Sequence, residues 1–371
     1  MVRKSPPKNQ KTSSSEKFPL TELYFYLTEG CNLACRHCWL APKFDPNGSS
    51  YPVLPLELFE KIITEARPLG LTGVKLTGGE PLLHPDILAI MQLIHREELS
   101  LTLETNGMLC TPEIAEEISR LDNPFVSVSL DGADAETHDT VRGVTGAFQK
   151  STTAIQHLVG NDIKPQIIMS IMQRNVDQVE AVIDLAENLG ASSVKFNIIQ
   201  PTARGKAFHD ISNGMDVEDL LRLGRHVDSV IAKNTDLQLF FDYPAAFRPL
   251  SRIASNEGCG ACGILSILGV LPSGKYALCG IGSHVKELIF GRAEKDSLAE
   301  VWLKNPILNQ LRSGLPARLT GICGKCLMKN HCLGSCIAQN YYRTDSLWSP
   351  FWFCEQAEAK GLFPKSRLNR L

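Results

Sequence analysis

The sequence predicts an α/β fold: a partial (β/α)6 TIM-like barrel over residues 21–235, followed by a cysteine-rich domain over residues 259–360. Three observations support this. Apolar, β-branched runs alternate with segments of helical spacing in the first half, which is the rhythm of βα units around a parallel sheet. Eight of the twelve cysteines lie between Cys259 and Cys354. The 371 residues are 43% hydrophobic, enough to build the cores of both parts.

Six apolar runs are the expected strands of the barrel: residues 22–28, 73–77, 101–105, 125–130, 166–171 and 193–199. Segments of helical spacing lie between them and are the expected helices, at residues 56–69, 87–98, 113–121, 147–159 and 177–189. Six units are fewer than the eight of a closed barrel, so this barrel is expected to be open. Reactive groups in such a sheet collect at the carboxyl ends of the strands.

The segments outside these domains are polar or mixed. Residues 1–20 are basic, polar and rich in Pro and Ser, which predicts a disordered tail without a signal peptide. Residues 236–258 are expected to bridge the domains, and residues 361–371 to form a C-terminal tail. No run approaches the roughly 20 apolar residues of a membrane span, so we expect a cytoplasmic protein. A formal net charge of -2 disfavours nucleic acid and membrane surfaces as partners.

Cys31, Cys35 and Cys38 form a CxxxCxxC motif directly after the first expected strand. Cysteines in a reducing cytosol favour metal or redox chemistry over disulfides. A [4Fe–4S] cube has four irons, so three thiolates leave one iron open to a small molecule, whereas a structural zinc site fills all four positions. The motif therefore indicates a catalytic cluster, with a chance pattern or a zinc half-site as the alternatives.

This motif, together with "TGGEP" at residues 77–81, resembles the radical S-adenosylmethionine (SAM) superfamily. The resemblance implies that SAM binds the open iron, and that an electron from the cluster cleaves it to methionine and a 5′-deoxyadenosyl radical that abstracts hydrogen. It also implies a set of SAM-binding residues, which are Gly78, Gly79, Glu80 and Pro81 at the methionine amino group, Ser129 and Arg142 at its carboxylate, and His37 near adenine. The alternatives are an ordinary strand–helix turn for the GGEP loop, a surface ion pair for Arg142 and an exposed loop position for His37.

The later cysteines resemble the SPASM domain of radical SAM enzymes, which binds two auxiliary [4Fe–4S] clusters. The resemblance implies that one is held by Cys259, Cys262, Cys279 and Cys336, and the other by Cys323, Cys326, Cys332 and Cys354. The protein would then carry three [4Fe–4S] clusters in all. A pair of zinc ribbons is the alternative for this region. Cys110 is left over and is expected to be a small core residue.

The two resemblances together imply a maturase that modifies a peptide or protein by a crosslink, a thioether or an epimerisation. A radical SAM enzyme of a small-molecule cofactor pathway is the alternative, and a non-catalytic iron–sulfur or zinc protein is another. Gly280 follows Cys279 where sulfatase-maturing members place an aspartate base, which disfavours that activity, and His284 is a nearby candidate base. One expected partner is a flavodoxin- or ferredoxin-type reductant. Because the residues before Thr21 leave no room for a leader-binding domain, either the leader docks on the barrel and SPASM surface or a separate protein presents it.

Overall fold

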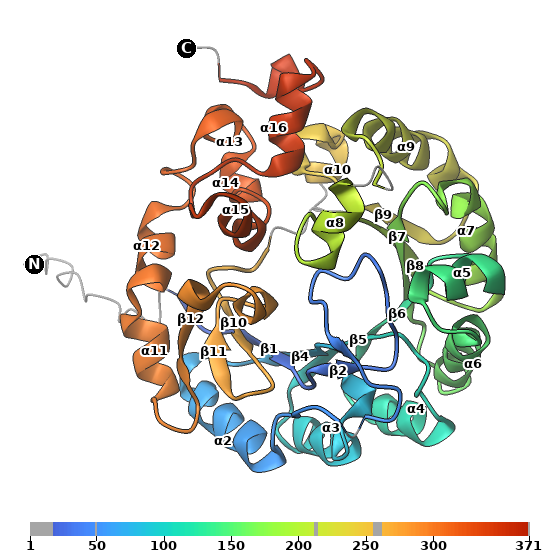
Figure 1. Ribbon diagram of the computed structural model, residues 1–371, viewed down its shortest axis with the longest axis vertical. Coiled ribbons are helices and arrows are strands. Elements are labelled where there is room, and N and C mark those ends of the chain that lie inside the picture. Colours follow the sequence, from blue (N-terminus) through green and yellow to red (C-terminus); the bar gives the residue numbers. More distant parts are fainter. Residues whose placement is uncertain (1–17, 49, 211–213, 255–261, 370–371) are drawn as a thin grey trace, which may run out of the picture.

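A computed structural model describes residues 18–48, 50–210, 214–254 and 262–369 (Figure 1). Within these residues, ten strands form one sheet in the order β12-β11-β10-β1-β4-β5-β6-β7-β8-β9. Helices surround the convex outer side of this sheet, and the loops that follow the strands gather over its concave side (Figure 1). The sheet is curved but not closed, as expected from the small number of βα units.

All six expected barrel strands are present and pair in parallel. They are β1 (Glu22–Tyr26), β4 (Gly73–Thr77), β5 (Ser100–Thr105), β6 (Phe125–Ser129), β7 (Gln166–Ile171) and β8 (Ser193–Ile198). A further parallel strand, β9 (Gln238–Phe241), lies beside β8 with Phe241 opposite Phe196. This strand falls in the segment predicted to be a bridge, so the barrel wall extends further than the sequence indicated.

The five expected helices are also confirmed: α2 (Leu56–Ala66), α3 (Ile87–Arg96), α4 (Pro112–Ser119), α6 (Ala147–Val159) and α7 (Val179–Asn188). Three more helices were not predicted, which are α5 (Ala135–Arg142), α8 (Arg204–Asp210) and α9 (Val217–Ser229). The segment of α5 is largely polar, and its buried face consists of His138, Val141 and Arg142. It therefore lacks the apolar stripe by which the other helices were recognised.

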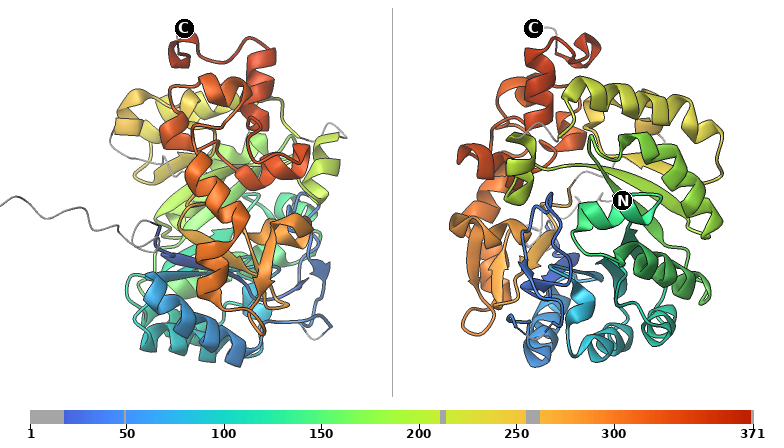
Figure 2. Two further views of the ribbon diagram at one scale, coloured as in Figure 1. Left: turned by 90° about the vertical axis from the view of Figure 1, so that its left-hand side faces the viewer. Right: turned by 45° about the vertical axis from the view of Figure 1, so that its right-hand side comes forward.

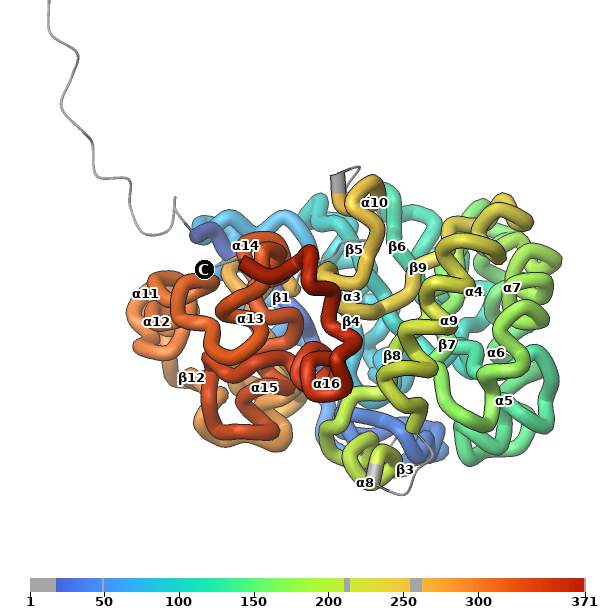
Figure 3. The backbone as a smooth tube through the Cα atoms, turned by 90° about the horizontal axis from the view of Figure 1, so that it is seen from above, coloured from blue at the N-terminus to red at the C-terminus, as the bar shows by residue number. Residues whose placement is uncertain are grey.

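The cysteine-rich half begins with strand β10 (Ile267–Val270), which pairs in parallel with β1 and places Leu268 opposite Leu23. Strands β11 (Lys275–Ala277) and β12 (Ile289–Arg292) follow in antiparallel order. Helices complete this half: α10 (Leu250–Ala254) before it, then α11 (Leu298–Lys304), α12 (Pro306–Gly314), α13 (Gly321–Lys325), α14 (Lys329–Cys332), α15 (Ile337–Thr344) and α16 (Trp352–Ala359). Figures 2 and 3 show helices α11–α16 gathered on one half of the molecule, away from α5, α6 and α7.

Shorter elements complete the chain. Strands β2 (Gly30–Cys31) and β3 (Lys43–Phe44) pair in parallel as a separate two-stranded sheet. Short 3-10 helices lie at Arg67–Leu69, Pro81–Leu83, Val176–Gln178, Ile231–Lys233, Ala245–Phe247, Gly280–Ser283, Lys286–Leu288 and Lys365–Arg367. No helix among the described residues is long and apolar enough to cross a membrane.

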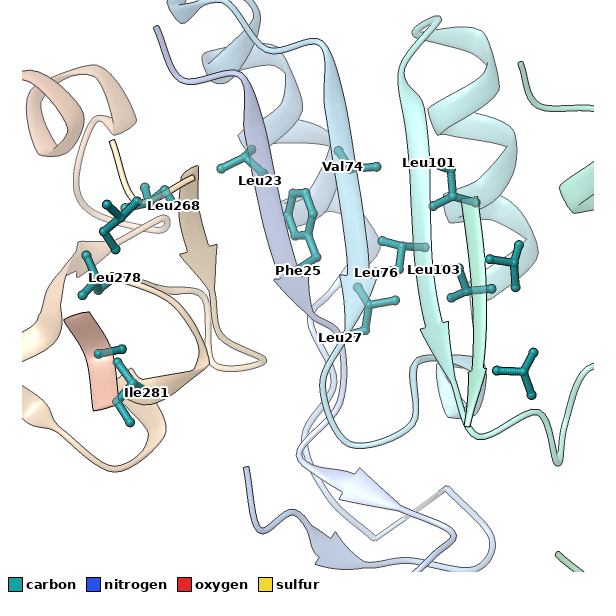
Figure 4. Packing of buried hydrophobic residues seen from close by; sticks show 14 of the residues in the cluster. Leu23, Phe25, Leu27, Val74, Leu76, Leu101, Leu103, Leu268, Leu278 and Ile281 are labelled. Atoms are coloured by element: carbon teal, nitrogen blue, oxygen red, sulfur yellow. The ribbon is translucent and has the colours of Figure 1, made fainter. Parts of the chain in front are cut away.

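The strands alternate between two faces, and this alternation separates the core from the functional side. Leu23 and Phe25 of β1 are fully buried on the side of the sheet that faces the outer helices (Figure 4). The ring of Phe25 lies 4.2 Å from that of Phe59 in α2. Successive side chains of a strand point to opposite faces, so Tyr24 and Tyr26 point to the concave side. The same alternation on β4, β5 and β8 directs polar side chains into the barrel.

Candidate active site

A cavity of about 190 Å³ lies at the carboxyl ends of the barrel strands. It is lined by the residues that follow β1, β4, β5 and β6, as expected for a sheet of this kind. Every residue predicted at the first cluster and at SAM lines it except Pro81, and the set comprises Cys31, Cys35, Cys38, His37, Gly78, Gly79, Glu80, Ser129 and Arg142. Pro81 is buried beside it as the first residue of a 3-10 helix.

Two of the three thiols of the motif, those of Cys31 and Cys35, lie close to nitrogen donors. Cys31 Sγ accepts the backbone N–H of Leu33 at 3.4 Å and lies 3.9 Å from Asn106 Nδ2. Cys35 Sγ accepts from the Arg142 guanidinium at 3.7 Å. Burial raises the pKa of both Cys31 and Cys35, so these thiols must release protons when they bind metal. Three soft sulfur donors beside one cavity, two of them with N–H groups directed at them, fit an iron–sulfur cluster.

Among the described residues, no three His, Cys, Asp or Glu side chains converge at the spacing of a single metal ion.

The GGEP loop is pressed against the loop that carries the cysteines. Gly79 N–H donates to the Thr28 carbonyl at 3.2 Å, and Glu80 N–H donates to the Gly30 carbonyl at 3.1 Å. A Cβ at Gly79 would lie 1.8 Å from the Gly30 oxygen, so only glycine allows this approach. Gly78 has φ +126°, which again favours glycine. The sequence of the loop thus fixes how closely the two loops pack.

Glu80 is a buried support of this loop and is 1% exposed. Its carboxylate accepts three hydrogen bonds, from Thr105 Oγ1 at 2.6 Å, from the Asn106 N–H at 2.8 Å and from the Leu82 N–H at 3.1 Å. Burial raises the pKa of Glu80 to about 7, although these hydrogen bonds oppose that shift. The side chain therefore joins the end of β4 to the end of β5.

Arg142 at the end of α5 belongs to a buried ion pair. Its guanidinium lies 2.9 Å from Asp131 Oδ2, and the carboxylate of Asp131 is fully buried. Asp131 also accepts the Ser170 N–H at 2.7 Å, and its own N–H donates to His138 Nδ1 at 3.1 Å. Arg142 Nε is buried without a hydrogen-bond partner beside the cavity. This arginine thus keeps one free donor, and the surface ion-pair alternative is wrong.

His37 is a mostly buried wall of the cavity. Its Nε2 lies 3.7 Å from Asp131 Oδ2, and its Nδ1 has no hydrogen-bond partner. Burial lowers the pKa of His37 to about 4, so the imidazole is neutral near pH 7. A neutral flat ring can lie against an aromatic base, which suits the position predicted for it. Ser129 lines the same cavity from the last residue of β6.

A second cavity of about 380 Å³ adjoins the first on the concave side of the sheet. It is lined by Tyr24 and Tyr26 of β1, by charged side chains of β4, β5 and β8, and by residues of the cysteine-rich half. Trp39, Thr77, Glu104 and Asn197 line both cavities and form the neck between them. A molecule in the larger cavity can therefore reach the edge of the smaller one.

Three of the four cysteines predicted at the first auxiliary site line this larger cavity: Cys262, Cys279 and Cys336. Burial raises the pKa of Cys279, and the neighbouring Cys336 and Cys262 raise it further, so the three thiols are near one another. Cys259, the fourth, lies outside the described residues.

The other predicted set is also brought together. Cys323, Cys326, Cys332 and Cys354 line one apolar cavity of about 20 Å³. The pKa of Cys354 is raised by a hydrogen bond with Cys323, then by burial and by the charges of Cys332 and Cys326. Cys332 also lines the larger cavity beside Cys336, so among the seven described positions this cysteine lies between the two predicted sets.

Gly280 and His284 bear on the choice of a base. A Cβ at Gly280 would lie 2.5 Å from the Tyr26 ring and 2.6 Å from Leu40 Cδ2, so a side chain fits there only if they move. His284 Nε2 lies 3.2 Å from the Trp39 carbonyl and 3.1 Å from the Leu40 carbonyl. His284 thus ties the cysteine-rich half to the loop of Cys38 and is not among the residues that line either cavity.

Several residues of the site escaped the sequence analysis. Asn106 directly follows the expected strand at 101–105 and was not predicted as a site residue, yet its amide contacts both Cys31 and Asn32. Asp131 directly follows the expected strand at 125–130 and was not predicted either, yet it pairs with Arg142. Lys75 and Lys195 were taken as strand residues, although a charged residue at alternate positions of a buried strand is a signal of an inner polar wall. Cys110 is 5% exposed in the core, away from both cavities, as expected.

Residues 25–186 match the family model of the radical SAM superfamily. The chain is 32% identical over 335 residues to the AdoMet-dependent heme synthase of Methanosarcina barkeri, covering 86% of this chain and 91% of that protein. It is 28% identical over 349 residues to the mycofactocin maturase MftC of Mycobacterium tuberculosis, covering 93% of this chain and 85% of that protein.

Solved structures show the same fold. Streptococcus suis SuiB bound to the precursor peptide SuiA has a TM-score of 0.72 at 20% identity, covering 91% of this chain and 76% of that one. The structure of anSMEcpe with bound AdoMet and the Cp18Cys peptide has a TM-score of 0.69 at 17% identity, covering 92% and 95%. From its sequence match and its fold, the chain belongs to the radical SAM superfamily and is a radical SAM enzyme of the type that carries a C-terminal SPASM domain.

Proposed function

We propose that this enzyme modifies a peptide or protein substrate by hydrogen abstraction, leaving a crosslink, a thioether or an epimerised residue. The observation that carries the proposal is the cavity of about 380 Å³ that meets the cysteine-motif cavity at the neck of Trp39, Thr77, Glu104 and Asn197. One side chain of a substrate peptide can enter this cavity while the rest of the peptide stays outside it. Relatives named for peptide products support this, among them the subtilosin biosynthesis protein AlbA of Bacillus subtilis at 27% identity.

The cysteine-motif cavity is the proposed site of SAM. Cys31, Cys35 and Cys38 would hold the [4Fe–4S] cluster, and the cluster with SAM supplies the 5′-deoxyadenosyl radical when both are bound. The backbone of Gly78 and Gly79 leaves room for the methionine amino group. Arg142 contributes its unpartnered Nε–H to the methionine carboxylate, while its Nη2 lies beside Asp131 and its Nη1 donates to Cys35 Sγ.

The remaining SAM contacts are proposed on the same geometry. Ser129 contributes its hydroxyl to the methionine carboxylate from the end of β6. The neutral ring of His37 forms the wall beside adenine. Glu80 also lines the cavity, and Thr105, Asn106 and Leu82 donate to its carboxylate. Its role in the proposal is to hold the GGEP loop against β5.

The two later cysteine sets would hold two auxiliary [4Fe–4S] clusters, which supply one-electron acceptors beside the substrate when bound. The first set, with Cys262, Cys279 and Cys336, lines the substrate cavity itself. The second set encloses only about 20 Å³, so its occupancy needs a direct count of iron. A flavodoxin- or ferredoxin-type protein is the proposed reductant, and a separate protein is proposed to present the leader of the substrate.

The proposal is tested with the anaerobically reconstituted enzyme, SAM, dithionite and each short peptide encoded beside its gene. We expect 5′-deoxyadenosine together with a change in mass of one peptide, by loss of two hydrogens for a crosslink or by deuterium uptake from solvent for an epimerisation. Formation of 5′-deoxyadenosine without a change in any peptide would contradict the peptide substrate and leave the radical SAM activity intact. Absence of 5′-deoxyadenosine would contradict the proposed site.

A small-molecule substrate is the second candidate, favoured by the 32% identity to a heme synthase over most of both chains. The same reaction mixture with an iron porphyrin in place of the peptides separates the two candidates. A product of altered mass from the porphyrin, with every peptide unchanged, would establish the second candidate. A modified peptide with an unchanged porphyrin would exclude it.

A further inference from the structure

The neck between the two cavities places certain side chains where a substrate meets SAM. Asn197 of β8 and Glu104 of β5 line both cavities, while Lys195 and Lys75 line the larger one. These side chains belong to alternate positions of inner strands, so they project from a rigid wall. Charge at this wall therefore selects the substrate group that sits next to the proposed site of hydrogen abstraction.

The charges at the wall are unevenly matched. Lys75 Nζ lies 2.5 Å from Glu104 Oε1 and 5.0 Å from the centre of the Tyr24 ring, so Lys75 and Glu104 satisfy each other. Lys195 is half-buried, and within the described part of the chain it forms no ion pair. Glu104 is already committed to Lys75, which leaves the ammonium of Lys195 available inside the cavity.

Asn197 supplies a second unmatched group two positions along the same strand. Its Oδ1 is buried and has no hydrogen-bond partner among the described residues. A buried amide oxygen without a donor costs about 1–3 kcal/mol, so its persistence points to a donor that is brought by a ligand. Lys195 and Asn197 project from the same face of β8. The pair thus offers a cation and an acceptor a short distance apart.

The rest of the cavity adds no carboxylate that meets Lys195. Arg248 also lines the cavity, and its guanidinium donates to the backbone carbonyls of Tyr243 and Phe241, which leaves its charge uncompensated by these contacts. The acidic residues among those that line the cavity are Glu104 and Asp242. The described side chains of the cavity therefore carry three cations against two carboxylates.

Lys195 also acts on Glu104 without forming an ion pair with it. Burial raises the pKa of the Glu104 carboxyl, and the charges of Lys75 and Lys195 lower it.

We propose that Lys195 and Asn197 together recognise an acidic peptide substrate, in which Lys195 pairs with a free carboxylate and Asn197 Oδ1 accepts a backbone N–H of the same peptide. The carboxylate belongs to an aspartate, a glutamate or a C-terminal residue at or beside the residue that reacts. This inference rests on the proposed peptide-modifying function and names the chemical class of its substrate.

The test pans a random peptide library, displayed with free C-termini, against the reconstituted enzyme loaded with SAM. Wild type is compared with K195Q, with the conservative K195R, and with K164Q, whose exposed lysine just before β7 lies outside both cavities. We expect wild type and K164Q to enrich acidic peptides. K195Q should bind these peptides at least about tenfold more weakly than wild type, and K195R should restore most of the affinity. Lys195 makes no ion pair in the described structure, so K195Q removes no such native contact.

Several outcomes of the panning would overturn the proposed role of Lys195. Enriched peptides without an excess of carboxylates, or an equal enrichment for wild type and K195Q, would overturn the role of Lys195 and leave the peptide function standing. A uniform loss of binding for acidic and neutral peptides alike in K195Q would show a structural role and also overturn it. A library that yields no binder to wild type would overturn the peptide function together with the inference. N197L is expected to bind the enriched acidic peptides more weakly than wild type, whereas K195R still binds them.

Discussion

The carboxylate of Glu80 accepts the backbone N–H of Asn106 at 2.8 Å, and this hydrogen bond joins the GGEP loop to the loop after β5. Asn106 in turn directs its side-chain amide toward Cys31 Sγ at 3.9 Å and Asn32 Oδ1 at 2.7 Å. One buried carboxylate thus connects the loop proposed for SAM with a ligand proposed for the cluster. Disturbance of Glu80 is expected to reach both.

The variant E80Q tests this connection. A glutamine keeps the size of Glu80 but places an NH2 group against one of the N–H donors of Leu82 and Asn106, so one hydrogen bond to a charged acceptor is lost and another is weakened. We expect SAM to bind about tenfold more weakly, which corresponds to about 1.4 kcal/mol. Equilibrium dialysis of the reconstituted enzyme measures it. E113Q, at an exposed position of α4, is the matched control, and equal SAM affinity of E80Q and E113Q would contradict the role of Glu80.

Iron counting tests the cluster assignment. Replacement of Cys31, Cys35 and Cys38 together by alanine is expected to lower the iron from about 12 to about 8 per chain and to abolish 5′-deoxyadenosine, because the cube loses its thiolates. C110A should keep about 12 irons, since Cys110 is a core residue. Wild type with about 8 irons would remove one auxiliary cluster from the proposal. Zinc in place of iron in the later cysteines would remove both.

Substitution at Gly280 tests the packing beside the auxiliary cysteine. G280D forces a side chain against the Tyr26 ring and Leu40, so we expect the free energy of unfolding to fall by about 1–3 kcal/mol without any sulfatase-maturing activity. Chemical denaturation under anaerobic conditions measures the first part. G160A, at the exposed end of α6 with φ -61°, should change stability by less than about 0.5 kcal/mol. A stable G280D enzyme that oxidises a sulfatase peptide would reverse this conclusion.

Two buried groups predict opposite effects of pH on stability. Burial lowers the pKa of His138 to about 4, so the unfolded chain takes up a proton first as the pH falls through 6.5, and stability is lost between about pH 6.5 and 4. Burial raises the pKa of Glu80 to about 7, so the folded chain takes up a proton first, and stability is gained as the pH falls from about 7 to 4.5. Each effect amounts to about 2 kcal/mol between pH 7 and 5, and the two oppose each other.

Variants separate the two effects. Removal of the titrating imidazole in H138N is expected to leave an enzyme whose stability rises by about 2 kcal/mol from pH 7 to 5 relative to wild type. For E80Q, the free energy of unfolding is expected to fall by about 2 kcal/mol from pH 7 to 5 relative to wild type. The asparagine oxygen can still accept the Asp131 N–H that His138 Nδ1 accepts, which makes H138N a mild replacement. Denaturant unfolding at the two pH values gives the result, and parallel pH curves for both variants and wild type would contradict it.

Much of the barrel follows from local patterns that the sequence displays. The six strands and five helices were predictable because each carries its own apolar run or stripe, and the cysteine loops because their spacing is distinctive. β9 was missed because "QLFF" lies in an aromatic connector whose pairing with β8 is decided by tertiary contacts. α5 was missed because its buried face is largely polar. Burial of this face is favourable only because Arg142 forms an ion pair with Asp131.

The site was predictable as far as its motifs reach. The cysteines, the glycines and His37 come together at one cavity because they follow neighbouring strands of one sheet. The supporting pairs were not visible, since Arg142 and Asp131, or Lys75 and Glu104, are brought together only by the strand order. The neck formed by Trp39, Thr77, Glu104 and Asn197 likewise depends on the curvature of the sheet.

The pairing of β10 with β1 has a mechanical consequence. Because Leu268 lies opposite Leu23 in one hydrogen-bonded ladder, the cysteine-rich half is stitched to the barrel along a strand and has no free hinge at that seam. Swinging it away would break several backbone hydrogen bonds at once. The seam thus fixes where the cysteine-rich half begins relative to the first barrel strand, and with it the side of the larger cavity that this half contributes.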